Sequence, residues 1–352
     1  PLLSTSKTWK DLHMNTPRDS GCTLTGALSV TTEIDGSVTI VHGPGGCAHH
    51  NFSLFHTLCT GRDDPRLPRL LSTDLAEKDI IFGGEDALDA AIRKAIEKNP
   101  SIVCVLSTCV TGAIGDDVDA ICRGFHGIPV ISIPTAGFLG GGFRDGHVQA
   151  LISLSSLAEC GEKTLSVNLV GEKTLEFERD EHFNEVKRLL FGIGIPICTR
   201  FICRSSMEDI SRLSRGSCNI LRDSSMCEVG NYLKGKFGTP FIGSFPVGPG
   251  GTIRFLEELG AVFSLDVSGA VAAEEARQER MFEEFHALKG KKVQFRDSLG
   301  NMTDSEVCSE IAESVGMDVH PAGQPLTVPD PFPVGTEGVR RLLRQWRRAC
   351  RA

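Results

Sequence analysis

Short apolar runs alternate with amphipathic patterns along the first half of the chain. Four runs rich in valine and isoleucine predict buried strands, at residues 37–43, 79–84, 101–107 and 128–134. Residues 85–99 place Leu88, Ile92, Ala95 and Ile96 on one face and predict a helix. Strands that alternate with helices are typical of a parallel sheet with crossover helices.

The same alternation returns in the second half. Further strands are predicted at residues 166–171, 195–202, 218–221, 239–243 and 290–295, with helices between them. We therefore expect an α/β fold of two doubly wound, Rossmann-like parallel-sheet domains followed by a short, truncated third α/β segment. The expected domains are 1–164, 165–265 and 266–352. No tandem repeat and no low-complexity tract is evident.

Composition and charge exclude several classes of protein. Apolar residues make up 40% of the 352 residues and charged residues 23%, which is typical of a globular protein. The net charge of −8 argues against a general nucleic-acid binder, and the Arg-rich segment 340–351 fits the solvated face of a terminal helix. The sequence has no run of 18 apolar residues and no signal-peptide pattern in residues 1–10, so we expect a cytoplasmic protein.

Thirteen cysteines are many for a cytoplasmic protein. A disulfide scaffold would be shorter and secreted, so ligation of a metal or cluster is the better interpretation, with inert buried thiols as the alternative for each cysteine. Cys47 and Cys109 each follow a predicted strand, where ligands bind in parallel α/β folds. Cys22 lies upstream among small residues, whereas Cys104 lies within a strand and is expected in the core.

Thiolates are the preferred ligands of iron–sulfur clusters, and glycines beside them let backbone N–H groups approach the sulfur atoms. We therefore expect cofactor contacts from residues next to the two loop cysteines, namely Gly45, Gly46, Thr108 and Gly112. Spacing alone leaves open that Cys22, Cys47 and Cys109 are buried small hydrophobes.

The glycines before Cys47 are not a phosphate loop. No Gly-Lys-Ser/Thr follows them, and no dinucleotide fingerprint is present, so nucleotide chemistry is expected to belong to a partner. His49 follows Cys47 and is a candidate rim residue of a cofactor site. Arg144 and His147 follow the glycine-rich segment 137–142 and are candidates for binding a substrate carboxylate or for moving protons, with an ordinary helix N-terminus as the alternative.

Several segments resemble the nitrogenase component 1 family. They are GCTLTGA, HGPGGCAHH, STDLAEKDIIFGGEDAL, LSTCVTGAIGDDVDAI, IPTAGFLGGGF and SVNLVG, in this order along the chain. The resemblance implies that Cys22, Cys47 and Cys109 are cluster ligands. It also implies a dimer with an identical or homologous subunit, and a P-loop ATPase with its own [4Fe–4S] cluster that delivers electrons. The cluster would be [4Fe–4S] or a P-cluster-like [8Fe–7S] centre.

Two departures from the family pattern bear on function. Asp223 stands where dinitrogen-reducing subunits have a cofactor cysteine, with Cys227 a loose substitute, and His320 is the nearby candidate for the cofactor histidine. The chain is therefore similar to the compact tetrapyrrole-reducing branch, which includes the nickel-sirohydrochlorin a,c-diamide reductive cyclase of F430 synthesis. The expected function is the catalytic iron–sulfur component of a two-component reductase, with Asp223, His49, Arg144 and His147 as catalytic candidates. The alternative is a scaffold for metallocluster assembly.

Overall fold

The computed structural model describes residues 21–61, 67–139, 141–176 and 178–351; the N-terminal ten residues and Gly140 of the glycine-rich segment lie outside them. The described chain forms two compact units. The cysteine unit comprises the described residues from 21 to 176 together with 197–243. The C-terminal unit comprises residues 178–196 and 244–351.

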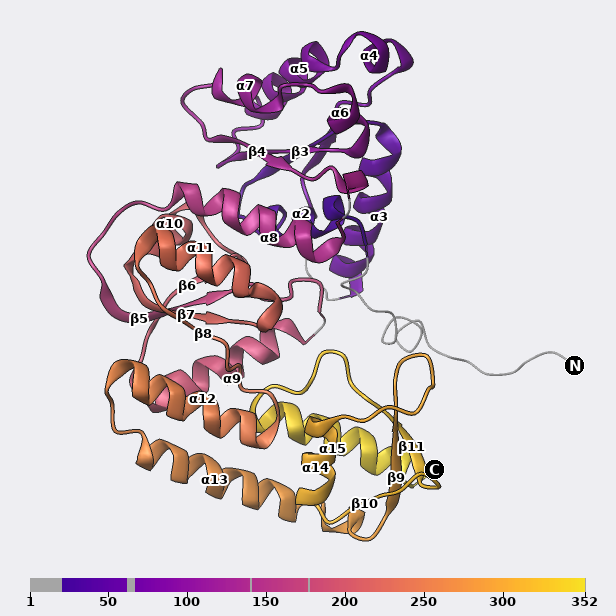
Figure 1. Cartoon of the computed structure of the whole chain (residues 1–352), viewed down its shortest axis with the longest axis vertical. Coiled ribbons are helices and arrows are strands. Elements are labelled where there is room, and N and C mark those ends of the chain that lie inside the picture. The colour runs from indigo at the N-terminus through magenta and orange to yellow at the C-terminus, as the bar shows by residue number, and fades with distance from the viewer. Residues whose placement is uncertain (1–20, 62–66, 140, 177, 352) are drawn as a thin grey trace, which may run out of the picture. The chain divides into compact units, whose positions relative to one another are not determined.

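The first sheet of the cysteine unit is parallel, with strand order β2-β1-β3-β4 (Figure 1). Its strands are β1 (Val38–His42), β2 (Leu70–Ser72), β3 (Val103–Ser107) and β4 (Val130–Pro134). The connecting helices are α3 (Gly45–Gly61), α4 (Glu77–Phe82), α5 (Glu85–Ile96), α6 (Cys109–Ile114) and α7 (Val118–Arg123). Every residue of β1 is buried, as expected for a strand covered on both faces. Cys104, expected in the core, is fully buried in β3.

The predicted strand at residues 79–84 is wrong. This stretch forms α4 and a Gly83–Gly84 turn, while the edge strand β2 lies earlier in the chain. The Asp79 side chain accepts a hydrogen bond from the backbone N–H of Ala76, which starts a helix, and the Ile81 and Phe82 side chains are 73% and 87% exposed. A short apolar run does not distinguish a strand from a helix, and here the run is not in the core.

The second sheet of the cysteine unit is also parallel, with order β6-β5-β7-β8. Its strands are β5 (Thr164–Val170), β6 (Ile197–Phe201), β7 (Gly216–Leu221) and β8 (Phe241–Ile242). Helices α10 (Met207–Ser211) and α11 (Cys227–Phe237) connect them. Both sheets reverse their strand order at one point, between β1 and β3 in the first sheet and between β5 and β7 in the second. Doubly wound sheets bind ligands beyond the carboxyl ends of the strands at such switch points.

Helix α2 (Thr23–Thr31) packs against α8 (Phe143–Leu154) through two glycines (Figure 1). A methyl carbon on Gly26 would lie 1.8 Å from the carbonyl oxygen of Phe143, and one on Gly146 would lie 1.8 Å from that of Thr23. The two backbones therefore touch, and all nine residues of α2 are buried. This contact fixes α2 against the start of α8.

The C-terminal unit contains the third sheet, which is parallel with order β10-β9-β11. Its strands are β9 (Lys292–Arg296), β10 (Asp318–Val319) and β11 (Gln324–Thr327). Its helices are α9 (Arg179–Gly192), α12 (Gly248–Phe263), α13 (Ser268–Glu283), α14 (Glu306–Ser314) and α15 (Gly335–Ala349). The predicted terminal helix is confirmed as α15, which buries Leu342, Leu343 and Trp346. The expected fold class, parallel α/β sheets with a small third segment, is confirmed.

A short repeat, Phe-Pro-Val-Gly, occurs at residues 245–248 and 332–335, and the sequence patterns had not revealed it. The two copies pair as an antiparallel bridge between Val247 and Val334. The N–H of Gly248 donates to the oxygen of Pro333, and that of Gly335 donates to the oxygen of Pro246. Each copy ends in a glycine of positive φ at the start of a helix, α12 or α15. Paired turns thus set the starting points of two helices.

None of the helices in the part of the chain that the structure describes combines the length and apolar character needed to cross a membrane.

Candidate functional site

The three predicted cluster cysteines lie at helix starts around the switch point of the first sheet. Cys47 is the third residue of α3, which follows β1, and Cys109 is the first residue of α6, which follows β3. Cys22 is the residue before α2. Cys22 and Cys109 are exposed and Cys47 is half-buried. The switch-point topology therefore accounts for the positions of the two cysteines that follow strands.

The three thiols interact electrostatically. Burial raises the pKa of Cys47, and the charges of Cys22 and Cys109 raise it further. Neighbouring thiolates repel one another, and bound iron ions would offset that repulsion. Within the described residues, no three His, Cys, Asp or Glu side chains are arranged to hold a single metal ion. A cluster differs from a single ion because each thiolate binds a different iron.

The predicted cofactor-contact residues surround these cysteines. A side chain on Gly112 would lie 2.7 Å from Cβ of Ala136, so packing requires this glycine, whereas one on Gly45 would meet only the exposed Asp74 carboxylate, which can move. Gly46 faces open space. The hydroxyl of Thr108 is buried and has no hydrogen-bond partner among the described residues, as expected of a group that contacts a bound ligand. These observations fit an iron–sulfur cluster, and the cofactor roles of the four residues stay predictions.

A buried hydrogen-bond network that the sequence patterns had not revealed joins the loops beside the cysteines. His42, the last residue of β1, contacts Asp116 through Nε2 at 2.9 Å and Thr73 through Nδ1 at 3.1 Å. Asp116 also accepts from the N–H of Gly84, and Thr73 accepts from that of Gly43. Burial lowers the pKa of His42 although Asp116 opposes this shift. A neutral imidazole therefore donates to Asp116 and accepts from Thr73, which joins three of the motif segments.

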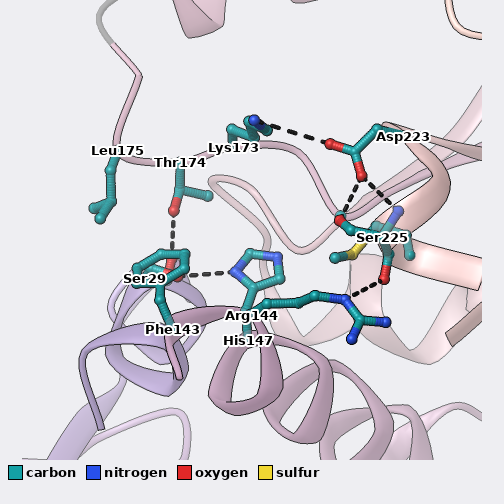
Figure 2. A pocket seen from close by; sticks show the side chains of 11 residues that line it. Ser29, Phe143, Arg144, His147, Lys173, Thr174, Leu175, Asp223 and Ser225 are labelled. Carbon is teal, nitrogen blue, oxygen red and sulfur yellow. Dashed lines mark hydrogen bonds and ion pairs between the residues drawn. The ribbon is translucent and has the colours of Figure 1, made fainter. Parts of the chain in front are cut away.

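A cavity of about 370 Å³ lies at the switch point of the second sheet (Figure 2). It is lined by residues from α2, α8 and the segments after β5 and β7, namely Ser29, Phe143, Arg144, His147, Gly171, Lys173, Thr174, Leu175, Asp223, Ser225 and Met226. Arg144, His147 and Asp223 were candidates from the sequence, and the fold brings all three to this one cavity. His49 is exposed on α3 and does not line it. Their catalytic role stays a prediction.

Sequence reasoning missed Ser29 and Lys173. The signal that could have found Lys173 is its place three residues after β5, beside the switch point. Lys173 Nζ lies 3.9 Å from Asp223 Oδ2, and Arg144 Nε donates to the Ser225 oxygen at 3.1 Å (Figure 2). The cavity therefore has cationic groups from two different elements, α8 and the segment after β5.

Ser29 sets the tautomer of His147. The Ser29 hydroxyl donates its single hydrogen to the oxygen of Gly26 at 2.6 Å. It must then accept from Nδ1 of His147, which lies 2.9 Å away (Figure 2). The neutral imidazole consequently carries its proton on Nδ1 and its lone pair on Nε2.

The sequence model of the nitrogenase component 1 type oxidoreductases matches residues 22–320. The chain belongs to this family. The matched range includes the three cysteines, the His42 network and every residue that lines the cavity. The family resemblance inferred from the motifs is thus confirmed.

Members of the nitrogenase component 1 family with known names include two kinds of protein. The iron-molybdenum cofactor biosynthesis protein NifE of Clostridium pasteurianum is 34% identical over 229 residues, covering 63% of this chain and 49% of the relative. The molybdenum-iron protein alpha chain of Methanococcus maripaludis is 26% identical over 326 residues, covering 86% of this chain and 67% of the relative. The chain spans about half the length of the NifE relatives from C. pasteurianum and Nostoc sp..

The fold also matches solved structures of this family. The structure titled "Nitrogenase Cp1 at pH 6.5" superposes with a TM-score of 0.66 at 24% identity, covering 85% of this chain and 60% of that chain. At this identity the match supports the fold alone.

Proposed function

We propose that this protein is the iron–sulfur component of a two-component reductase, which receives electrons from an ATP-dependent iron protein in the cytoplasm and reduces a small substrate. The observation that carries the proposal is the electrostatic coupling of three thiols, Cys22, Cys47 and Cys109, at a topological switch point. A bound cluster would accept and pass on single electrons. The second component is proposed because the chain belongs to the component 1 type oxidoreductases, a family that works with an iron-protein partner.

The cavity of Figure 2 is the proposed substrate site. Cys22 precedes the buried helix α2 and Ser29 lies within that helix about two turns later, or about 10 Å along its axis. Substrate reduction takes up protons as well as electrons. The proposed proton-transfer groups are Lys173, which lies beside Asp223, and His147, which Ser29 orients so that Nε2 can take up a proton and pass it on.

Iron content tests the cluster proposal. Anaerobically purified wild type is expected to contain about four or eight irons per dimer, with matching sulfide and an EPR signal on reduction. Cys109→Ser removes one ligand, so we expect loss of most iron or an altered signal. Cys160→Ser is the matched control, because Cys160 is exposed and is not one of the three coupled thiols. A folded wild type that cannot be loaded with iron and sulfide would rule the proposal out.

The proposed docking face for the ATPase is α4. Phe82 and Ile81 are largely exposed there, and α4 packs against α6, which begins at Cys109. The backbone N–H of Gly84, two residues after Phe82, is bound to Asp116 of the buried network. Exposed apolar side chains on an ordered helix beside the cysteines are suited to binding a protein partner.

Phe82→Ala is expected to slow reduction by an iron-protein ATPase at least about tenfold, because aromatic side chains dominate the free energy of many interfaces. The thermal stability should not change, since Phe82 is 87% exposed. Phe191→Ala is the matched control, with an 86% exposed side chain on α9. Stopped-flow reduction with MgATP measures the rate. Equal rates in the two variants would exclude α4 as the docking face.

A scaffold for metallocluster assembly is the second candidate, favoured by the named NifE relatives at 31–34% identity. A scaffold should release its cluster to an acceptor protein, whereas a reductase should retain it through repeated reduction and oxidation by substrate. Iron transfer to an acceptor, measured with labelled iron, separates the two. Reduction of a tetrapyrrole stays a prediction.

A further inference from the structure

We propose that the cavity of Figure 2 binds a small organic anion, with the anionic group at Arg144 and an apolar body against Phe143, Leu175 and Met226. The ligand is a substrate only if the proposed function holds; its binding does not depend on that function. A volume of about 370 Å³ lies near the lower end of the range of small-molecule sites, which is roughly 300–1,000 Å³. The ligand is therefore small.

Arg144 is oriented to receive an anion. Its Nε–H donates to the oxygen of Ser225 at 3.1 Å, which fixes the plane of the guanidinium group. Its terminal nitrogens lie 3.8 Å from Asp145 and 4.0 Å from Glu228, both longer than hydrogen bonds. Both of these carboxylates are about half exposed, so water screens their charge. The terminal N–H groups thus retain the capacity for charge-assisted hydrogen bonds to a ligand.

The remaining charges in the cavity balance one another. Asp223 accepts from the N–H of Ser225 at 2.8 Å and lies 3.9 Å from Lys173. Lys173 also lies 3.7 Å from the buried carboxylate of Glu176, so its charge is offset by two carboxylates. Arg144, whose neighbouring carboxylates are half exposed, is therefore the cation of the lining that is suited to an anionic ligand.

The other walls are apolar or neutral. Phe143, Leu175 and Met226 are each less than one-tenth exposed, and their side chains border the cavity. Gly171 has no room for a side chain, because a methyl carbon there would lie 2.4 Å from Met226 Sδ. Burial of apolar surface therefore favours a ligand with an apolar body, which bare inorganic phosphate lacks.

Calorimetry with benzoate, benzamide and inorganic phosphate tests the proposal. Benzamide has nearly the same shape as benzoate without the charge, and phosphate has charge without an apolar body. Wild type should bind benzoate with a Kd in roughly the millimolar range and benzamide at least about tenfold more weakly, because one charge-assisted hydrogen bond is lost. Arg144→Gln should raise the benzoate Kd about tenfold or more, and Arg212→Gln, an exposed arginine outside the cavity, should leave it unchanged.

Three results would overturn the proposal: no benzoate binding to folded wild type, benzamide binding as tight as benzoate, or an unchanged benzoate Kd in Arg144→Gln. Phosphate binding as tight as benzoate binding would refute the claim that the ligand has an apolar body. Benzoate binding should persist in Cys109→Ser, since Cys109 does not line the cavity. Iron content and benzoate binding are thus measured independently. The cluster proposal can fail while the anion-site proposal holds, and the reverse.

Discussion

Gly146→Ala should lower the free energy of unfolding by about 3 kcal/mol, with a melting temperature lower by roughly 5–10 °C. The added methyl carbon would lie 1.8 Å from the carbonyl oxygen of Thr23, so α2 and α8 must move apart. The backbone of Thr23 cannot move aside as a flexible side chain could. The displacement also separates Ser29 from His147, so benzoate binding should weaken in the fraction that folds. Thermal denaturation and calorimetry measure both effects.

Gly235→Ala is the matched control. Gly235 lies within α11, and a methyl carbon there has no atom within 4 Å. Alanine is the better helix former by about 0.5–1 kcal/mol, so this variant should be slightly more stable than wild type. A Gly146→Ala protein as stable as wild type, with unchanged benzoate binding, would show that the two helices do not require this contact.

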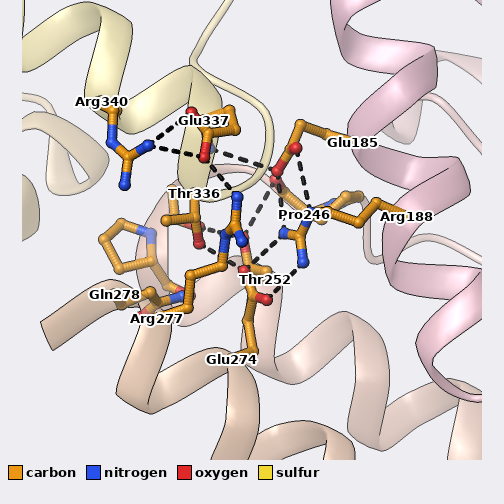
Figure 3. A network of polar contacts seen from close by, with 12 residues as sticks. Glu185, Arg188, Pro246, Thr252, Glu274, Arg277, Gln278, Thr336, Glu337 and Arg340 are labelled. Atoms are coloured by element: carbon orange, nitrogen blue, oxygen red, sulfur yellow. Dashed lines mark hydrogen bonds and ion pairs between the residues drawn. The ribbon is translucent and has the colours of Figure 1, made fainter. Parts of the chain in front are cut away.

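Arg188→Met should destabilise the C-terminal unit by about 3 kcal/mol. Arg188 donates two hydrogen bonds to Glu274, both at 2.7 Å, and two to Glu185 (Figure 3). The side chains of Glu274 and Glu185 are 5% and 7% exposed, so removing the arginine leaves two buried carboxylates without their cation. Arg212→Met, which breaks an exposed pair on α10, should change stability by less than about 0.5 kcal/mol.

The pH dependence of stability should reverse in Arg188→Met. Burial alone would raise the pKa of Glu274, but hydrogen bonds from Arg188 and Thr336 lower it below the ordinary value of 4.5. In wild type this stabilisation is present above pH 4.5 and is lost as the pH falls further. Without Arg188 burial prevails and the pKa rises, so the variant should gain stability as the pH falls from about 7 to 5. Urea unfolding at both pH values measures the change, and a variant that loses stability over this range would contradict it.

Periodicity predicted most of the strands because strands covered on both faces are mostly apolar, as β1 and β3 are. It failed at residues 79–84, where the apolar residues of α4 are exposed. Burial is a tertiary property, and an apolar run that faces solvent looks the same in the sequence as one that faces the core. The edge strand β2 was missed for the converse reason, since its residues are only half-buried.

Some residues of the candidate site could be predicted from the sequence and others could not. Cys47 and Cys109 follow strands directly, so strand assignment was sufficient to find them. Lys173 and Ser29 have no distinctive local pattern, and only the strand order of the second sheet and the α2–α8 contact bring them to the cavity. His42 was hidden for a similar reason, because its partners Thr73 and Asp116 are distant in sequence and meet only once three loops converge.

The complete burial of α2 has a consequence for how this site can vary. One inserted residue would rotate Ser29 by about 100° relative to Cys22 and lengthen the segment by about 1.5 Å. Because every face of α2 is packed, a rotated α2 would place its side chains against neighbours that do not fit them. The distance between the Cys22 thiol and the cavity is therefore fixed by the packing of α2. Ligand preference can therefore change through the side chains that line the cavity, on α2, α8 and the segments after β5 and β7, while this separation stays the same.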